Sequence, residues 1–414
     1  MIKKITASGV KGFVNAPASK SVAQRAIAIA ALAEGESLLR FPGDSDDVRA
    51  AINICKAFGA QVTHQDDYLT IQGGLKPPSQ PLDCGEAGLG IRMFSALSAT
   101  LNTPVTLTGR GSLATRPTDM IQDSLRAAGV QCETQNGLLP VMVKGPLAGG
   151  VARIDGSVSS QVLTGLLIAA PYALKPALFR VHDLKSRPYV DITLQMMKDF
   201  GVEVENRNYE EFFVPAPVKY AAREYTIEGD WSGAAFMLVA AAIAGELEIR
   251  NLNPQSPQAD RAILEAIKSS GASLQIMNEK LMVKKAPLQA FTFDATHCPD
   301  LFPPLVALAA ACEGTTRIQG VSRLRVKESD RAIALQQEFG KMGVAITFND
   351  DWMHIVGGPV QGATVHSHHD HRIAMACATV ALIAQGPVVI EEAEAVAKSY
   401  PEFYEDLEGV RSGG

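Results

Sequence analysis

The sequence lacks the features that mark membrane-spanning and exported proteins. Its longest unbroken apolar run, residues 234–244, has 11 residues, whereas a helix needs about 20 to cross a bilayer. The first residues, MIKKITASGVKGFV, are basic but contain no apolar core of the kind found in signal peptides. We therefore expect a cytoplasmic protein that does not associate with a membrane.

Paired cysteines and an excess of positive charge are also missing. The six cysteines stand alone, at positions 55, 84, 132, 298, 312 and 377. None is spaced as CxxC, so neither a zinc ribbon nor a disulfide framework is indicated. The net charge is −6 and the pI about 5.8, which argues against a nucleic-acid-binding protein. Hydrophobic residues make up 47% of the 414 residues, which suits a globular protein of two or three domains.

A repeat of roughly 70 residues runs through the chain. Amphipathic helical patterns end at glycines spaced by 70 or 72 residues, namely Gly59, Gly129, Gly201, Gly271 and Gly343. A glycine closes a helix in the left-handed conformation at the lowest steric cost, because it lacks a Cβ atom. The spacing predicts that each of these glycines ends a helix.

A second series of helical patterns, apolar and rich in alanine, lies between the first. The two series define six units, each reading helix, strand, amphipathic helix, strand, turn and strand, with the last unit cut short at its second helix. Because the first helix of each unit is almost wholly apolar, we expect it to be buried. Six units are too many for one core, so two lobes of three units are expected. A repeat scaffold without any chemistry fits these patterns as well.

Polar clusters interrupt the repeat where the buried helices begin. They read PASKSVAQR (17–25), CGEAGLGIR (84–92), GSVSSQ (156–161), CPD (298–300) and HDHR (369–372), and RVKESDR (325–331) is expected to open the second helix of its unit. A helix N-terminus exposes unpaired N–H groups and a partial positive charge. Lysine, arginine, serine and glutamine added there favour anion binding.

Lys20 and Arg25 lie at the start of a helix whose continuation is almost wholly apolar. The surrounding residues do not form the GxxxxGK[ST] frame of a P-loop. A solvated helix face is one interpretation of these two cations. A charge that opens a buried helix needs a partner, however, and a bound anion would serve as one.

The charged run 325–331 also allows two interpretations. Lys327 and Arg331 are four residues apart and would share a helix face, with Glu328 beside them. Two cations next to a carboxylate suit phosphate binding combined with proton transfer. A solvated helix start is the alternative.

Four histidines surround Asp370 in the run 366–371. A strand would place His366 and His368 on one face, which invites a metal site, although no remote cysteine, histidine or glutamate cluster completes it. A polar loop before a helix is the alternative. His371 and Arg372 at the expected helix start favour an anion.

Together and in this order, these clusters resemble the 5-enolpyruvylshikimate-3-phosphate (EPSP) synthase family. The matching runs are PASKSVAQRA, DSDDVR (44–49), DGSVSSQ with LT (155–164), SRPYVDITL (186–194), EGDWS (228–232), RVKESDR, DHR and AKSYPEF. The resemblance covers almost the whole chain and implies an α/β fold of two lobes, each with three βαβαββ repeats and buried helices. This is the inside-out α/β barrel of enolpyruvyl transferases. It implies a discontinuous lobe, 1–18 plus 229–414, and an inserted lobe, 19–228, with the active site in the cleft between them.

The family transfers the enolpyruvyl group of phosphoenolpyruvate (PEP) to the 5-hydroxyl of shikimate 3-phosphate and releases phosphate. This step belongs to chorismate and aromatic amino acid biosynthesis and is the target of the herbicide glyphosate. The resemblance implies two small-molecule substrates, no cofactor, no metal and no covalent nucleophile, and we expect a monomer. Because both substrates are anionic, the site needs several cations even though the whole chain is acidic. Ligands from both lobes imply that closure completes the site.

The resemblance also implies roles for individual residues. The shikimate 3-phosphate site is implied to be Lys20, Ser21, Arg25, Ser159, Ser160, Gln161, Ser186, Tyr189, Asp300 and Lys327. The PEP site is implied to be Lys20, Gly88, Arg116, Gln161, Arg331, Arg372 and Lys398, with Glu328 and His371 beside it. Asp300 is implied as the base on the 5-hydroxyl. Glu328, with Lys20, is implied to protonate the PEP methylene and later remove that proton.

The sequence departs from the family pattern near the expected PEP site. The unusual residues are Glu86, Leu89, Met93, Arg187 and Arg323. Glu86 replaces a usual asparagine, and a carboxylate there would weaken PEP and glyphosate binding unless a cation such as Arg323, Arg92 or Lys20 neutralises it. We expect partial neutralisation and a lower glyphosate sensitivity than is typical; a solvated Glu86 without effect is the alternative.

Two rival functions follow from the same repeat. UDP-N-acetylglucosamine enolpyruvyl transferase usually has a reactive cysteine near the position of Arg116, and the run GRGSLATRP (109–117) has none. A non-catalytic, anion-binding homologue is suggested by Glu86. The presence of Lys20, Asp300 and Glu328 argues against that second rival.

Overall fold

The computed structural model describes residues 1–65, 67–277, 280–325 and 327–412. The chain divides into two compact units, one formed by Met1–Ser19 with Glu228–Gly414 and the other by Lys20–Ile227. The first unit is discontinuous because the second is inserted into it. No helix in the described residues is long and apolar enough to cross a membrane.

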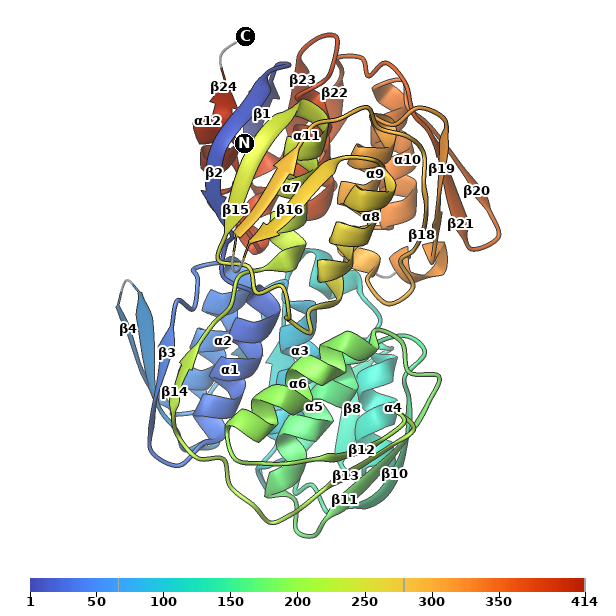
Figure 1. Cartoon of the computed structure of the whole chain (residues 1–414). Coiled ribbons are helices and arrows are strands. Elements are labelled where there is room, and N and C mark those ends of the chain that lie inside the picture. Colours follow the sequence, from blue (N-terminus) through green and yellow to red (C-terminus); the bar gives the residue numbers. More distant parts are fainter. Residues whose placement is uncertain (66, 278–279, 326, 413–414) are drawn as a thin grey trace. The chain divides into compact units, whose positions relative to one another are not determined.

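The inserted unit contains, within its described residues, three four-stranded sheets (Figure 1). The first repeat comprises α1 (Lys20–Leu32), β3 (Glu36–Arg40), α2 (Asp46–Ala57), β4 (Gln61–Gln65), β5 (Tyr68–Gln72) and, from the far end of the unit, β14 (Glu224–Thr226). The second comprises β6 (Leu82–Asp83), α3 (Gly88–Ser98), β7 (Val105–Thr108), α4 (Asp119–Ala127), β8 (Gln131–Gln135) and β9 (Leu138–Lys144), with the short 3-10 helix η1 (Gly111–Thr115). The third comprises β10 (Gly150–Asp155), α5 (Gln161–Ala169), β11 (Ala177–His182), α6 (Arg187–Asp199), β12 (Glu205–Arg207) and β13 (Glu211–Val214).

Each of these sheets has the same strand order. In the third repeat, β10 pairs in parallel with β11, from Gly150 opposite Ala177 to Asp155 opposite His182. Strand β13 then pairs antiparallel with β11, and β12 pairs antiparallel with β13. A parallel pair needs a crossover helix and an antiparallel pair needs only a turn, so this order is the expected βαβαββ succession.

The discontinuous unit repeats this plan. Its first sheet takes β2 (Gly9–Asn15) from the N-terminus and adds β15 (Gly245–Arg250), β16 (Ser273–Met277), β17 (Lys280–Lys284) and β24 (Arg411–Ser412), with α7 (Trp231–Ala244), η3 (Ala259–Ala262) and α8 (Ile263–Ser269). Its second contains β18 (Thr292–Asp294), β19 (Thr315–Gln319), β20 (Ala345–Asn349) and β21 (Trp352–Val356), with η4 (Pro299–Leu301), α9 (Phe302–Ala310), η5 (Val321–Leu324) and α10 (Arg331–Lys341). Its third is shorter and contains β22 (Thr364–His366), β23 (Val388–Glu391) and β1 (Ile2–Ile5), with α11 (His371–Ala381), η6 (Ala393–Lys398) and α12 (Phe403–Val410).

Buried helices form the core of each unit. Helices α1, α3 and α5 pack together in the inserted unit, and α7, α9 and α11 pack together in the discontinuous unit. Every residue of α3 and of α11 is buried. Small residues permit this packing: a Cβ atom placed on Gly165 of α5 would lie 2.8 Å from the Cα of Met93 on α3. The predicted burial of the first helix of each unit, and the α/β fold with three repeats in each half, are confirmed.

The glycines of the 70-residue repeat adopt the conformation that the sequence predicts. Each has a positive φ, of 89° at Gly59, 78° at Gly129, 90° at Gly201, 91° at Gly271 and 82° at Gly343. Each follows the last turn of an amphipathic helix and precedes a strand or extended segment. The sequence prediction that these glycines close helices is confirmed.

The charged run 325–331 differs from expectation. Helix α10 begins only at Arg331, so Lys327 and Glu328 lie in the bend before it, and Val326 lies outside the described residues. Asp330 is the N-cap, since its side chain accepts a hydrogen bond from the backbone N–H of Ile333 at 3.3 Å. A capping aspartate starts a helix after itself. The prediction that Lys327 and Arg331 share a helix face is therefore wrong.

Candidate active site

Arg25 on α1 is a buried cation whose neighbours are neutral. Its Nε donates to Thr193 Oγ1 at 2.9 Å and its Nη1 to the carbonyl of Ser21 at 2.7 Å. Its Nη2 donates to the carbonyl of Tyr189 at 3.3 Å and to Thr164 Oγ1 at 3.5 Å. In the part of the chain that the structure describes, no carboxylate pairs with it, and burial lowers the pKa of Arg25 to about 10. A buried charge held by neutral acceptors is a candidate contact for an anion.

Lys20 begins α1 and forms an ion pair with the α2 residue Asp47. The Nζ atom of Lys20 lies 3.1 Å from Asp47 Oδ2, and both side chains are largely buried. The pair fixes the ammonium group at the start of the helix. Asp47 belongs to the DSDDVR run, but no role was predicted for it from the sequence. Its place on the buried face of an amphipathic helix was the feature that could have indicated a partner for a buried cation.

The starts of α5 and α6 supply hydroxyl and amide groups. Ser159 Oγ accepts the backbone N–H of Gln161 at 3.2 Å, and Ser160 is the N-cap of α5. Ser186 is the N-cap of α6 and has a left-handed φ of 53°. Tyr189 is linked to Arg25 through its carbonyl. These residues come from the same repeat, and α5 and α6 pack against each other.

The start of α3 is surrounded by two arginines and a glutamine. Arg92 Nη1 donates to the carbonyl of Gly88 at 3.0 Å and to Gln161 Oε1 at 2.8 Å. A Cβ atom placed on Gly88 would lie 2.8 Å from Nη1 of Arg116 and 2.9 Å from Nη1 of Arg92. Glycine at 88 therefore lets both guanidinium groups approach the N-terminus of an 11-residue helix. From the sequence, Arg92 was named only as a possible partner of Glu86 and not as a substrate-binding residue, although an arginine within an otherwise apolar helix pointed to such a role.

In the discontinuous unit, one carboxylate lies among three cations. Asp300 Oδ1 accepts from Arg331 Nη1 at 2.8 Å and from Lys327 Nζ at 3.2 Å, and its Oδ2 accepts from Arg372 Nη2 at 3.4 Å. Burial by itself would raise the pKa of Asp300, but Arg372, Lys327 and Arg331 hold that pKa well below its ordinary value. Asp300 is thus ionised at neutral pH.

Arg331 is fully buried and lies between three carboxylates. Besides Asp300, its Nη2 forms an ion pair with Glu328, and its Nε donates to Asp370 Oδ2 at 2.9 Å. Asp370 is the N-cap of α11 and accepts the backbone N–H of Arg372 at 3.0 Å. Burial lowers the pKa of Arg331, but the three carboxylates more than reverse this and raise it. Asp370 thereby joins the starts of α10 and α11, a role that sequence analysis missed.

Three further predicted residues lie on the same unit. His371 and Arg372 begin α11 and are buried, and Lys398 ends η6 with only 6% of its surface exposed. The Nη1 atom of Arg372 is buried and has no hydrogen-bond partner among the described residues. A buried guanidinium nitrogen without an acceptor among the described residues is a candidate donor to a bound anion.

The histidines before Asp370 do not share a strand face, because β22 ends at His366 and His368 has a left-handed φ of 54°. The His368 ring lies 2.7 Å from Glu338 Oε1, and His366 Nε2 lies 3.3 Å from Glu392 Oε2. Among the described residues there is no group of three or more potential ligands arranged to hold a metal ion. The polar-loop interpretation of these histidines is the one that the structure supports.

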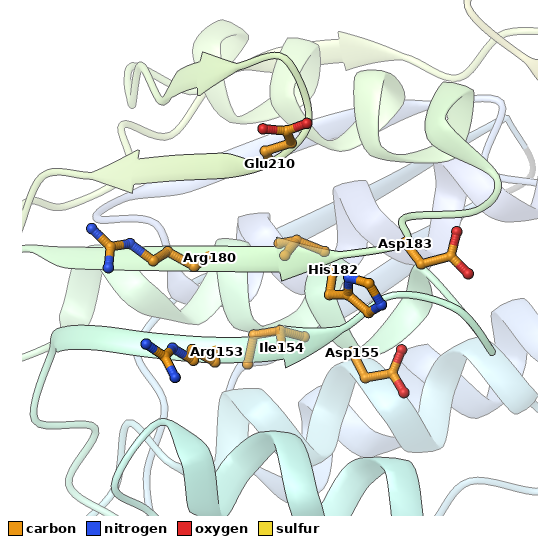
Figure 2. Close-up of a pocket in the computed structure, with 8 residues that line it drawn as sticks. Arg153, Ile154, Asp155, Arg180, His182, Asp183 and Glu210 are labelled. Carbon is orange, nitrogen blue, oxygen red and sulfur yellow. The ribbon is translucent and has the colours of Figure 1, made fainter.

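A surface depression of about 610 Å³ lies elsewhere, at the carboxyl ends of β10 and β11 (Figure 2). Arg153 and Arg180 extend from directly paired positions of the two strands, and Arg180 is neutralised by Glu211 at 3.0 Å. The other polar residues of its wall are Asp155, His182, Asp183 and Glu210. No predicted site residue is part of this wall. Its carboxylates outnumber its arginines, so it is poorly suited to anionic substrates.

The structure therefore gathers the predicted residues into two groups. In the inserted unit, Arg25 is linked to Ser21 and Tyr189, and Gln161 is linked through Arg92 to Gly88. In the discontinuous unit, ion pairs connect Asp300 with Lys327, Arg331 and Arg372, and Arg331 with Glu328.

The fold is that of solved enolpyruvyl transferases. The structure of EPSP synthase from Acinetobacter baumannii is similar, with a TM-score of 0.84 and 28% identity over 99% of this chain and 98% of that chain. The enolpyruvyl transferase NikO from Streptomyces tendae shares the fold, with a TM-score of 0.79 and 17% identity over 99% of this chain and 97% of that chain.

Sequence comparison is more specific. The profile of the family EPSP synthase (3-phosphoshikimate 1-carboxyvinyltransferase) matches residues 5–407. The 3-phosphoshikimate 1-carboxyvinyltransferase of Methanosarcina acetivorans is 40% identical over 97% of this chain and 96% of that protein. That of Methanocorpusculum labreanum is 38% identical over 98% of this chain and 97% of that protein. The chain belongs to the EPSP synthase family, a family of transferases.

Proposed function

We propose that this chain transfers the enolpyruvyl group of PEP to the 5-hydroxyl of shikimate 3-phosphate and releases phosphate. Within a chain of this family, the observation that carries the proposal is the Asp300 carboxylate set among Lys327, Arg331 and Arg372, with Glu328 paired to the same Arg331. This cluster combines two carboxylates for proton transfer with three cations for anionic substrates. No observation favours UDP-N-acetylglucosamine as the acceptor or a non-catalytic role.

The binding residues follow from the charges of the two substrates. We assign shikimate 3-phosphate to Lys20, Ser21, Arg25, Ser159, Ser160, Gln161, Ser186, Tyr189, Asp300 and Lys327. Arg25 supports this assignment because it is buried without a carboxylate partner in the described chain and would be neutralised by the substrate phosphate. We assign PEP to Lys20, Gly88, Arg116, Gln161, Arg331, Arg372 and Lys398, with Glu328 and His371 beside it. The buried Nη1 atom of Arg372 has no hydrogen-bond partner among the described residues, and this supports that assignment.

The reaction needs an acid and a base that act together. Glu328, with Lys20, donates a proton to the methylene carbon of PEP, which makes the adjacent carbon cationic. The 5-hydroxyl oxygen attacks this carbon while Asp300 takes the hydroxyl proton. Glu328, now a carboxylate, takes a proton back from the new methyl group, and the electrons of that C–H bond form the double bond as the carbon–oxygen bond to phosphate breaks. Arginine and lysine side chains stabilise the departing phosphate.

An assay of phosphate release tests the reaction. Phosphate should appear only when shikimate 3-phosphate and PEP are both present, and addition of a chelator should leave the rate unchanged. Turnover that persists when UDP-N-acetylglucosamine replaces shikimate 3-phosphate would contradict the assignment.

The variant Glu328→Gln tests the proton-transfer role. Glutamine is nearly isosteric but cannot donate or accept the proton, so the chemical step should slow by about 100-fold or more, while shikimate 3-phosphate binding changes little. Glu408→Gln is the matched control, because Glu408 also pairs with an arginine three residues later. Single-turnover kinetics measure the step. A near-normal rate in Glu328→Gln would move the role elsewhere, with Lys20 the first residue to examine.

A further inference from the structure

The carboxylate of Glu86 is held by the 3-10 helix η1 (Gly111–Thr115). Its Oε2 accepts two hydrogen bonds from Ser112, one from the backbone N–H at 3.0 Å and one from the hydroxyl at 2.8 Å. Both residues are half-buried. Two donors from a single residue hold the carboxylate oxygen in a defined position, because a charged acceptor makes short and directional hydrogen bonds.

The same hydroxyl group reaches Arg116. Ser112 Oγ accepts a hydrogen bond from Arg116 Nη2 at 3.0 Å. A serine hydroxyl has one hydrogen and two lone pairs. Since its hydrogen is directed to Glu86, its lone pairs are left for the guanidinium group. A chain of hydrogen bonds therefore runs from Arg116 through Ser112 to Glu86, and the negative charge at its end strengthens both links.

The local backbone is shaped for this arrangement. Gly111 has a φ of +54°, and a Cβ atom placed on it would lie 2.2 Å from Glu86 Oε1 and 2.8 Å from Oε2. Only glycine leaves this space for the carboxylate. At the other end of the chain of hydrogen bonds, the Arg116 guanidinium lies against Gly88 at the start of α3, where a Cβ atom on Gly88 would be 2.8 Å from Arg116 Nη1.

We propose that Glu86 and Ser112 are positioning residues that hold the guanidinium of Arg116 at the N-terminus of α3, ready for the carboxylate or phosphate group of PEP. This inference rests on the proposed function, because it assigns a purpose to the orientation of a proposed PEP ligand. A pre-positioned arginine binds an anion more tightly than a mobile one, since less side-chain entropy is lost on binding.

If Glu86 positions Arg116, it strengthens PEP binding, whereas the sequence suggested that its charge weakens PEP binding. If the carboxylate acted by direct repulsion, Glu86→Asn and Glu86→Gln would tighten PEP binding. If it acts through Ser112, both neutral variants should weaken PEP binding, because the hydroxyl of Ser112 is then held less firmly. The direction of the change therefore distinguishes the two hypotheses.

Removing the hydroxyl link gives the sharper test. Ser112→Ala should raise the KM for PEP about tenfold, the scale of a hydrogen bond to a charged group, and leave the KM for shikimate 3-phosphate unchanged. Ser112→Thr, which retains a hydroxyl, should restore the KM for PEP. Thr115→Ala is the matched control, since Thr115 Oγ1 donates to the carbonyl of Ser112 at 3.3 Å on the same short helix but lies outside the chain of hydrogen bonds. It should leave both KM values unchanged.

Crystal structures of unliganded wild-type and Ser112→Ala protein test the positioning without the reaction. We expect the Arg116 guanidinium to be ordered against Gly88 in the wild type and displaced or disordered in the variant. An unmoved guanidinium, an unchanged KM for PEP in Ser112→Ala, or tighter PEP binding in Glu86→Gln would each overturn the proposal. A wild-type protein that releases no phosphate from its two substrates would overturn the proposed function instead, and the two crystal structures would still decide whether Ser112 positions Arg116.

Discussion

At the scale of single residues, the most informative feature is a positive charge buried without an opposite charge. Arg25 is 1% exposed, and its hydrogen-bond acceptors in the described chain are the hydroxyl groups of Thr193 and Thr164 and the carbonyls of Ser21 and Tyr189. Neutral acceptors compensate only part of the lost hydration of a guanidinium group. The protein thus bears an energetic cost in its unliganded form that an anionic substrate would relieve.

This cost predicts opposite effects of Arg25→Met on stability and binding. The unliganded variant should be as stable as the wild type or more stable, because methionine removes the buried charge and retains much of the volume. The KM for shikimate 3-phosphate should rise by roughly 100-fold, as expected when a buried charge-assisted contact is lost. Urea unfolding and steady-state kinetics measure the two quantities.

Arg126→Met is the control for that experiment. Arg126 also donates to a neutral carbonyl, that of Cys132 at 2.8 Å, but it is exposed. Arg126→Met should change neither the free energy of unfolding nor the KM for shikimate 3-phosphate. Loss of stability in Arg25→Met, together with an unaltered KM, would mean that Arg25 is a structural residue.

Asp260 in η3 predicts a dependence of stability on pH. It is 2% exposed, and burial, together with the negative charge of Asp300, raises its pKa to about 6, against the attraction of Arg372. A carboxyl group whose pKa is higher in the folded than in the unfolded state binds more protons when folded, so stability falls as pH rises from about 4 to 6. Ser232 and Asp230 are the other groups that act on it.

Asp260→Asn should remove this loss. The variant should be more stable than the wild type by about 3 kcal/mol at pH 8, where Asp260 is ionised in both states, and similar to it at pH 4. Urea unfolding at the two pH values measures the difference. An equal effect at pH 4 and pH 8 would show that the change acts through packing and not through ionisation.

At the scale of elements, the repeat depends on how each amphipathic helix ends. Gly129 has a φ of +78° after α4, whereas Gly340 lies inside α10 and does not have a positive φ. A Cβ atom on either glycine would meet nothing within 4 Å. The two positions therefore differ in backbone conformation and not in available space.

Alanine should have opposite effects at these two glycines. Gly129→Ala should lower the free energy of unfolding by about 1 kcal/mol, because an L residue is strained at positive φ. Gly340→Ala should raise it by about 0.5 kcal/mol, because alanine favours the helical backbone. Chemical denaturation of both variants checks the signs, and a change of the same sign in both would refute the conformational explanation.

The start of helix α10 differs from the one that the residue spacing predicted. The spacing within 325–331 suggested a helix face shared by Lys327 and Arg331, but the Asp330 cap delays α10 until Arg331. The residues still meet, because Asp300 binds both cations. A partner from another element, and not helical periodicity, sets their geometry.

At the scale of the whole molecule, the net charge of −6 opposes anionic substrates while the cations of the site attract them. Salt screens both interactions over a distance of about 10 Å at 0.1 M. Because the proposed ligands lie closest to the cations, the attraction should dominate. The KM for both substrates should rise severalfold between about 20 mM and 300 mM potassium chloride. Potassium glutamate over the same range should raise both KM values in the same way. A falling KM would show that the overall negative charge controls binding.

The monomeric state and the cytoplasmic location stay predictions.

The repeat, the burial of the first helices and the glycines that end the second helices were all predictable from the sequence. These features depend on neighbouring residues. A buried or amphipathic helix produces a pattern of apolar residues with a period of 3.6, and a helix that ends in the left-handed conformation usually has a glycine there. The family motifs likewise marked Lys20, Arg25, Asp300, Glu328 and Arg331 from their order along the chain.

The contacts between side chains that lie far apart in the sequence could not be predicted and follow from the packing of the folded chain. Arg25 bonds to Thr193, 168 residues away in sequence, and Arg331 bonds to Asp370, 39 residues away. Glu86 was expected to be partly neutralised by a cation such as Arg323, Arg92 or Lys20, whereas in the structure its carboxylate accepts hydrogen bonds from Ser112, whose hydroxyl accepts one from Arg116. Such contacts depend on how separate helices and turns pack, within one repeat or between repeats, and no periodicity in the sequence encodes them.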